Sequence, residues 1–314
     1  MTKVIAIILP AYNEELTIAD TIKDFFSVCP EAVIYVVDNA STDRTSELTR
    51  AAFRNLGCKG FLLDQPRKGK AAAVRKAFMD IDADIYVIAD ADMTYPASSL
   101  PTLLAPVLDG RAEIVCGNRH SSGGYRRENK RPLHDFGNNL TRWLINTLFK
   151  GSLGDILTGY RVMTKRFVKN YPILSDGFEL ETEMSIHALD KGYSIIELPT
   201  DYRSRPEGSF SKLNTFTDGV LVLKTIFSIF VKYRPLLFFS LCSFCFAAAA
   251  LAVGAVPVME YITTDKILHI PLVILASGLS ILAMLSFSVA VILDGLAAGQ
   301  RFNHALQLLH WSNR

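Results

Sequence analysis

Apolar and polar positions alternate in blocks along the first two thirds of the chain. Continuous apolar runs that end at a polar residue are typical of strands buried on both faces of a parallel sheet. Such runs lie at residues 3–12, 32–41, 59–64 and 84–92. Between them, apolar residues recur at helical spacing in residues 13–29, 42–57 and 69–81. This alternation predicts an α/β domain with a mostly parallel sheet, right-handed crossovers and helices on both faces.

The pattern continues less regularly up to residue 212. Residues 112–119 and 193–205 are predicted as further strands, and residues 137–151 and 177–192 as helices. The segment that begins at Gly154 is expected to start as a loop. Residues 213–234 then carry apolar side chains at helical spacing beside Lys and Asp, which is typical of a helix that lies flat on a membrane surface.

The last third of the chain is nearly uncharged. Residues Leu236 to Val258 and Pro271 to Leu293 contain no charged side chain. Each stretch of about 23 residues makes a helix of roughly 35 Å, against a hydrocarbon core of about 30 Å. Apolar residues surround each helix, so two membrane spans joined as an antiparallel hairpin are predicted rather than core helices of a soluble protein. The expected organisation is a large domain at 1–212, a juxtamembrane helix at 213–234, a transmembrane hairpin at 235–296 and a tail at 297–314.

Basic residues flank the two predicted spans unequally. They precede the first span and follow the second, at Lys224, Lys232, Arg234, Arg301 and Arg314. The linker between the spans carries only Lys266 among two acids. By the positive-inside rule, both termini and the large domain are expected in the cytoplasm.

Overall charge and the spacing of the cysteines argue against nucleic-acid binding and against a zinc site. The formal net charge is +2, which argues against nucleic acid as a partner. None of the five cysteines has zinc-site spacing, and reduced thiols are expected. They are Cys29, Cys58, Cys116, Cys242 and Cys245.

Polar side chains follow three of the predicted strands, where a parallel sheet places its ligands. They are Asn13 and Glu14, Asp38 and Asn39, and Asp90 and Asp92. Two carboxylates at positions i and i+2 can coordinate Mg²⁺ or Mn²⁺, and the ion then keeps coordination sites for phosphate oxygens. A solvated turn or a helix cap is the alternative for the aspartate pair, and Thr94 and Pro96 would suit that role.

Lys70 follows Gly69 at the start of a predicted helix, where it could face a phosphate. A nucleoside diphosphate would then lie across the strand ends, with its base near Asp38 and its pyrophosphate on the metal. The alternative is that the surrounding Arg-Lys-Gly-Lys sequence is an exposed basic turn.

Eight motifs in one order carry a family resemblance. They are PAYNEE, VVDNASTD, GKAAAV, DADMTYP, GNR, DILTGYR, GFELETE and YRSRPEGSFSK. In this order they resemble the family 2 glycosyltransferases of the polyprenyl-phosphate type, among them dolichol-phosphate mannose synthases and bactoprenol glucosyltransferases. The resemblance implies a Rossmann-like GT-A fold, a nucleotide-sugar donor, Mg²⁺ or Mn²⁺, and an inverting transfer of one sugar to a polyprenyl phosphate at the membrane.

The resemblance also implies roles for single residues. Asp90 and Asp92 match the metal-binding pair, and Asp92, Asp155 and Arg119 are the expected catalytic residues. The residues expected to bind the nucleotide sugar are Pro10, Ala11, Tyr12, Glu14, Asp38, Asn39, Lys70, Asp90 and Ala91. Asn39 stands where many members of the family have a second aspartate, and this weakens a carboxylate role at that position.

The acceptor phosphate is expected to meet basic side chains, because the planar fork of arginine binds phosphate oxygens bidentately. The residues that resemble such contacts are Arg119, Arg131, Arg203, Arg205, Ser209 and Lys212. Two interpretations are open for the basic residues Arg126, Arg127 and Lys130: they belong to a solvated loop, or they bind anionic lipid headgroups.

Three further residues of these motifs are ambiguous. Arg161 is a candidate to pair with Asp155 structurally, and a surface position is a stronger alternative for Glu181 than for Glu183, which matches a family position. A polyprenyl phosphate is already ionised at pH 7, so little general-base help is needed, and Asp155 or Glu183 would supply it.

Donor and assembly stay open at this point. Thr94 replaces the glutamine of mannose synthases, which favours UDP-glucose or UDP-N-acetylglucosamine over GDP-mannose. A GDP-mannose-dependent synthase and a non-catalytic membrane scaffold with a vestigial GT-A fold remain alternatives. Two spans are few to organise a lipid site, so a homo-oligomer is expected.

Overall fold

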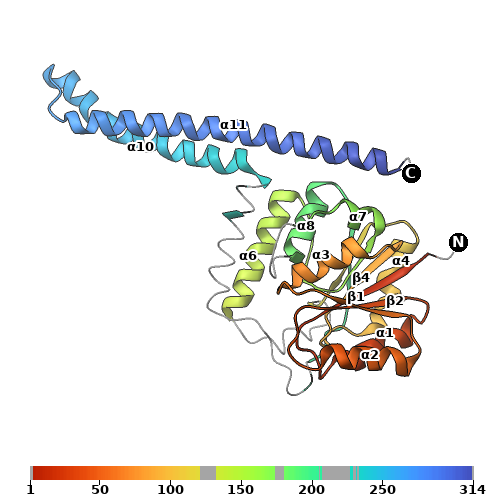
Figure 1. Ribbon diagram of the computed structural model, residues 1–314. Helices are drawn as coiled ribbons and strands as arrows, with labels where there is room; N and C mark the ends of the chain where they lie inside the picture. The colour runs from red at the N-terminus through yellow and green to blue at the C-terminus, as the bar shows by residue number, and fades with distance from the viewer. Residues whose placement is uncertain are drawn as a thin grey trace. The chain divides into compact units, whose positions relative to one another are not determined.

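The computed structural model describes residues 3–120, 132–173, 180–204, 206, 227–228, 231 and 233–312, with backbone only for 132–138 and 310–312 (Figure 1). The chain divides into two compact units, residues 1–220 with 307–314, and residues 221–306. Four predicted acceptor residues, Arg131, Arg205, Ser209 and Lys212, lie outside the described residues. So does most of the predicted juxtamembrane helix at 213–234.

A seven-stranded sheet forms the centre of the first unit. Its strands are β1 (Ile5–Ala11), β2 (Val33–Asp38), β3 (Gly60–Asp64), β4 (Ile85–Ile88), β5 (Ile114–Asn118), β6 (Arg161–Thr164) and β7 (Ile195–Pro199). They lie in the order β3-β2-β1-β4-β6-β5-β7. Every neighbouring pair is parallel except those of β6, which runs antiparallel to both β4 and β5. The predicted α/β fold with a mostly parallel sheet is confirmed.

Helices cover both faces of this sheet (Figure 1). They are α1 (Ile18–Val28), α2 (Thr45–Leu56), α3 (Lys70–Asp80), α4 (Leu100–Leu108) after the short η1 (Ala97–Ser99), α6 (Pro132–Phe149), α7 (Lys165–Asn170) and α8 (Leu180–Asp190). One apolar core packs α1, α2 and α4 against the sheet, and a second packs α3, α7 and α8 against the opposite face. Helix α2 is followed by Gly57 as its C-cap, and the φ of 60° at this residue is left-handed, a conformation that favours glycine.

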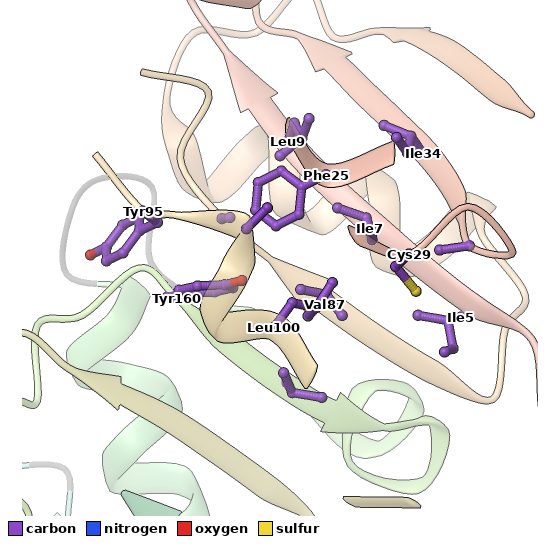
Figure 2. Packing of buried hydrophobic residues seen from close by; sticks show 14 of the residues in the cluster. Ile5, Ile7, Leu9, Phe25, Cys29, Ile34, Val87, Tyr95, Leu100 and Tyr160 are labelled. Atoms are coloured by element: carbon purple, nitrogen blue, oxygen red, sulfur yellow. The ribbon is translucent and has the colours of Figure 1, made fainter. Parts of the chain in front are cut away.

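Strand β1 shows why the apolar run is continuous. Ile5, Ile7 and Leu9 point into the first core, while Ala6 and Ile8 point into the second. Because successive side chains alternate between faces, a strand covered on both sides needs no polar position. Figure 2 shows the first core, with Tyr95 at its margin and the Tyr95 hydroxyl directed away from the aliphatic side chains.

The fold differs from the sequence prediction at β6 and at α4. The segment after Gly154 begins as a loop, as expected, but then forms β6 between β4 and β5. Helix α4, which starts with a proline in its first turn, is not predicted from the pattern. Strand β4 ends at Ile88, so Asp90 and Asp92 lie on the loop beyond it, as expected.

The second unit contains the long apolar helix α10 (Pro235–Thr264) and most of a second one, α11 (Ile270–Ser312). Their most apolar windows have mean hydropathies of 2.4 and 2.3, and only 6% of each window is buried. A core helix of a soluble protein would be mostly buried, so these helices have the length and composition of membrane spans. The hydroxyl of Ser243 on α10 donates to the carbonyl of Ala283 on α11 at 2.7 Å, which joins the two as a hairpin.

Candidate functional site

The carboxyl ends of β1, β2 and β4 meet at one edge of the sheet. Ala11 pairs with Asp38 in register, and the N–H of Asn39 donates to the carbonyl of Ala11 at 2.8 Å. The Thr17 hydroxyl, from the start of α1, donates to the carbonyl of Ala91 at 2.8 Å. The polar residues after the three strands therefore lie along a common edge, as expected from a parallel sheet.

Lys70, at the first position of α3, lies between two carboxylates. Its Nζ is 2.5 Å from Oδ1 of Asp90 and 2.6 Å from Oε1 of Glu181 on α8. Burial by itself lowers the pKa of Lys70, but the charges of Asp90 and Glu181 outweigh it and raise the pKa, so the ammonium stays charged. The interpretation of this segment as an exposed basic turn is therefore wrong for Lys70.

Glu181 is a member of this cluster that the sequence prediction did not include among the site residues. It is buried, not at the surface. The available signal was its spacing, because Met184, Ser185 and Ala188 lie on the same side of α8 and all are buried. That signal places Glu181 inside the domain, but it does not reveal Lys70 as the partner.

Gly159, just before β6, leaves room for the lysine–aspartate pair. A Cβ at this position would lie 3.0 Å from Nζ of Lys70 and 3.1 Å from both carboxylate oxygens of Asp90. The N–H of Gly159 donates to the Tyr95 hydroxyl at 2.8 Å. Burial raises the pKa of that hydroxyl, which stays protonated. The negative charges of Asp90 and Asp155 raise this pKa further, and the positive charges of Arg119 and Lys70 lower it.

Asp92 is more deeply buried than Asp90. Its Oδ1 accepts from the Thr94 N–H at 3.2 Å and from the Thr94 hydroxyl at 2.5 Å. Thr94 thus orients one oxygen of Asp92, as the turn alternative supposes. The side chain of Asp90 keeps 30% exposure. Groups of three or more possible metal ligands from His, Cys, Asp and Glu do not occur among the described residues.

A second ion pair, between Arg119 and Asp155, joins the end of β5 to the loop before β6. Nε of Arg119 donates to Oδ2 at 2.7 Å, and Nη2 donates to Oδ1 at 2.9 Å. Burial raises the pKa of Asp155, but hydrogen bonds and charge from Arg119 outweigh this and hold the pKa below its usual range. Glu197 on β7 fixes the loop by accepting from the N–H groups of Gly154 and Asp155, at 2.7 and 2.6 Å.

Arg161 does not pair with Asp155, contrary to one expectation. Its guanidinium is fully buried and donates instead to the carbonyls of Ile156, Thr158 and Glu181 and to the Ser185 hydroxyl. The reason is its place at the start of the antiparallel β6, where it faces α8 and its own preceding loop. Arg161 thereby ties the loop of Asp155 to the helix of Glu181.

The side chains of Asp38 and Asn39 form hydrogen bonds with different segments of the chain. Asp38 accepts from the Ser41 N–H at 3.0 Å and also from the Ser46 hydroxyl. The Asn39 amide accepts from the Gly69 N–H at 2.6 Å and donates to the Arg67 carbonyl at 2.6 Å. Asn39 therefore holds the loop that leads into Lys70, and an aspartate could not supply its donor.

The other predicted nucleotide-binding residues lie beside these. Pro10 and Ala11 end β1, and the Tyr12 hydroxyl accepts from Nζ of Lys68 at 3.2 Å. The Glu14 N–H donates to the Thr45 hydroxyl at 2.8 Å. The first contact joins the loop after β1 to the loop before α3, and the second joins it to the start of α2.

Arg203 is connected to the acidic loop through the backbone. Its N–H donates to the Thr94 carbonyl at 2.9 Å, while its guanidinium lies 3.3 Å from Asp24 and is 46% exposed. The preceding Tyr202 packs against Tyr95, with ring centroids 5.8 Å apart, and Arg119 lies over the Tyr202 ring at 5.7 Å. The structure thus brings Asp92, Arg119 and Arg203 to one region of the sheet edge.

Sequence comparison assigns the domain to a family. The family described as "Glycosyl transferase family 2" matches residues 6–171. The chain is 30% identical over 262 residues to glycosyltransferase AglJ of Haloferax volcanii, covering 82% of each chain. It is 28% identical over 230 residues to the dolichyl-phosphate hexose transferase of the same organism, covering 73% of this chain and 95% of the relative.

Solved structures share the fold. The structure of glucosyl-3-phosphoglycerate synthase from Mycobacterium tuberculosis in complex with Mn²⁺ and UDP-glucose superimposes with a TM-score of 0.56. The match has 21% sequence identity and covers 73% of this chain and 78% of that one. At this identity the likeness establishes the GT-A fold of the domain and nothing more about its substrates.

Proposed function

Because the chain belongs to glycosyl transferase family 2, we propose that it transfers one sugar, with inversion, from a nucleotide sugar to a polyprenyl phosphate. The carrying observation is the strand-edge cluster of Asp90, Asp92 and Lys70 beside the Arg119–Asp155 pair. This arrangement offers carboxylates for a cation and basic groups for two phosphates. Relatives named for dolichyl-phosphate transfer support the acceptor class.

Asp90 and Asp92 would hold Mg²⁺ or Mn²⁺. Carboxylate oxygens suit these hard cations, and Mg²⁺ is commonly held by one or two carboxylates together with substrate phosphates. The missing Cβ of Gly159 keeps space beside Asp90, and the partial exposure of Asp90 leaves it accessible, so the residues fit the ion. When bound, the ion would act as a Lewis acid that neutralises the departing diphosphate.

The protein's own groups supply positioning. Asn39 holds the loop that places Lys70 at the start of α3, where its ammonium can meet a donor phosphate. Asp38 lies further along the same edge, where the base would bind. Pro10, Ala11, Tyr12, Glu14 and Ala91 complete the nucleotide-sugar site.

Asp155 acts by orienting Arg119 rather than by taking a proton. A carboxylate with a lowered pKa is a weak base, and the acceptor phosphate is ionised at pH 7 without help. Arg119 is held in a fixed orientation by its two bonds to Asp155. Together with Arg203, and with Arg131, Arg205, Ser209 and Lys212 from outside the described residues, it would align the acceptor.

The apolar helices α10 and α11 would anchor the chain in the membrane, with the large domain and both termini in the cytoplasm. Lys232 and Arg234 before the first helix and Arg301 within the second support this orientation. The proposed division is a catalytic domain at 1–212, a juxtamembrane helix at 213–234, a hairpin at 235–296 and a tail at 297–314. We also infer a homo-oligomer, since two helices are few to enclose a lipid site.

UDP-glucose or UDP-N-acetylglucosamine is the favoured donor, and GDP-mannose is the runner-up. Thr94 supports this choice, because its hydroxyl is already engaged by Asp92 and offers no amide toward the sugar. A thermal-shift screen of the three nucleotide sugars with Mn²⁺ would rank them.

The test is a transfer assay with the full chain in detergent. Radiolabelled nucleotide sugars are incubated with polyprenyl phosphate, with Mg²⁺ or Mn²⁺ or with EDTA, and the lipid phase is counted. We expect labelled lipid from one donor only when a divalent cation is present. If no donor yields labelled lipid, a non-catalytic scaffold explains the chain better.

A further inference from the structure

We propose that Glu181 is a positioning residue that keeps Lys70 from closing the cation site at Asp90. The inference rests on the proposed metal-dependent function, because it concerns how readily a divalent cation reaches the aspartate pair. It assigns a task to a buried acid outside the strand-end loops.

The geometry makes Lys70 a shared cation. Its Nζ lies 2.5 Å from Asp90 and 2.6 Å from Glu181, and the side chains of Lys70 and Glu181 are only 14% and 7% exposed. With Glu181 present, the ammonium has a second anionic partner to hold it when a metal ion takes the oxygen of Asp90. Without the Glu181 carboxylate, Asp90 would be the remaining carboxylate of these two contacts. The Lys70 ammonium would then compete with the metal ion for Asp90.

Charge balance supports the same role. The three carboxylates of Asp90, Asp92 and Glu181 and the one ammonium of Lys70 leave two negative charges, which a single divalent cation neutralises. The neighbouring Arg119–Asp155 pair adds no net charge. If Glu181 were neutral, one negative charge would remain, and Lys70 would compete with the metal for Asp90.

The site also holds Glu181 in place independently of Lys70. Arg161 donates to the backbone carbonyl of Glu181 at 2.9 Å, and the Ser185 hydroxyl donates to the same carbonyl at 2.9 Å. Neither contact involves the carboxylate. Substitution of Glu181 by glutamine therefore leaves these anchors intact and keeps an oxygen that can accept from Nζ.

The test compares Mn²⁺ binding by the wild type, Glu181→Gln, Lys70→Met and the double variant. Free hexaaquo Mn²⁺ is measured by electron paramagnetic resonance with the purified full chain in detergent and without nucleotide. We expect Glu181→Gln to raise the Kd for Mn²⁺ about tenfold, the effect of roughly one lost charge–charge interaction in a partly buried site. Lys70→Met should bind Mn²⁺ at least as tightly as the wild type.

The double variant separates positioning from a structural role. Lys70→Met with Glu181→Gln restores two negative charges and removes the competing ammonium, so its Kd should return to within about twofold of the wild type. A merely structural Glu181 would leave the double variant as weak as Glu181→Gln or weaker. Glu113→Gln is the matched control, because it removes the same charge from another ion pair, that of Glu113 with Arg166. Glu113 directly precedes β5 and so lies at the opposite edge of the sheet from Asp90.

Failure of this inference can be told from failure of the proposed function. If the wild type binds Mn²⁺ and Glu181→Gln binds it equally well, or the double variant is not restored, Glu181 has no such role while the metal assignment stands. If the wild type binds no Mn²⁺, both are overturned.

Discussion

Arg119 and Asp155 form a two-bond ion pair, with Nε to Oδ2 at 2.7 Å and Nη2 to Oδ1 at 2.9 Å. The two residues are 36 positions apart in the chain, and both are buried. The pair joins the end of β5 to the loop that precedes β6. It therefore links an expected phosphate contact to an expected catalytic acid.

Asp155→Asn should destabilise the domain and weaken acceptor binding. It leaves the Arg119 guanidinium buried without its anion, which typically costs about 3–5 kcal/mol of the free energy of unfolding. The expected readouts are a lower midpoint in chemical denaturation and a raised KM for polyprenyl phosphate at unchanged KM for the donor. A raised donor KM with an unaffected acceptor KM would contradict the assignment of Arg119 to the acceptor.

The contribution of Asp155 should depend on pH with a definite sign. The folded-state pKa of Asp155 is lowered, so its stabilisation is fully present above the unfolded value of about 3.9 and is lost as the pH falls through the folded value. The stability difference between the wild type and Asp155→Asn should therefore shrink below about pH 4. Denaturation of both proteins between neutral pH and acid measures it, and a difference that grows on acidification would refute the prediction.

Asp92→Asn should lower the rate of transfer severely without unfolding the protein. The asparagine oxygen can still accept both bonds from Thr94, so the turn is retained, but the charge for the cation is lost. We expect kcat to fall by roughly two to three orders of magnitude, the usual effect of removing one electrostatic stabiliser. Melting temperature within a few degrees of the wild type is the accompanying control, and retained turnover would remove Asp92 from the metal site.

Gly159→Ala should perturb the Lys70–Asp90 contact. The added Cβ would lie 3.0 Å from Nζ and 3.1 Å from the carboxylate oxygens, so the side chains must shift. A displacement of this kind lowers turnover by about tenfold to a hundredfold when the groups position substrate. Gly299→Ala, which meets no atom within 4 Å, is the matched control. Equal activity of the two variants would argue against tight packing at Gly159.

Asn39→Asp should loosen the loop at 65–69 and raise the donor KM. The carboxylate cannot donate to the Arg67 carbonyl, which then faces a negative oxygen. An unsatisfied or repelled polar group of this kind costs about 1–3 kcal/mol. Asn170→Asp, at an exposed amide that donates to the Arg166 carbonyl, controls for the substitution itself. Denaturation midpoints of both variants are compared, and equal losses would leave Asn39 without a special role.

The linker between α10 and α11 should face the outside of the cell. Lys266→Cys should react with a membrane-impermeant maleimide in intact cells, because residue 266 lies between two helices whose other ends are both proposed to be in the cytoplasm. Glu47→Cys, on the exposed face of α2, should react only after permeabilisation. The parent protein, with its five native cysteines, gives the background. The reverse labelling pattern would invert the proposed topology.

Sequence alone determined the strand–helix alternation, the edge at which β1, β2 and β4 end, the acidic pair beyond β4 and the two apolar helices. These features are local: a buried strand or a spanning helix is defined by the side chains of a few consecutive residues. The motif order also led correctly to the family. Even Asn39 and Lys70 were located by the strand ends and helix starts they occupy.

The charge partners were decided only by the tertiary structure. β6 inserts antiparallel between β4 and β5, which turns Arg161 toward α8 and leaves Asp155 to Arg119. Lys70 and Glu181 are 111 positions apart and meet only because α3 and α8 pack on the same face of the sheet. Periodicity reports which face of an element is buried, but it carries no information about which distant element covers that face. Ion pairs between remote segments therefore follow from sheet order and packing.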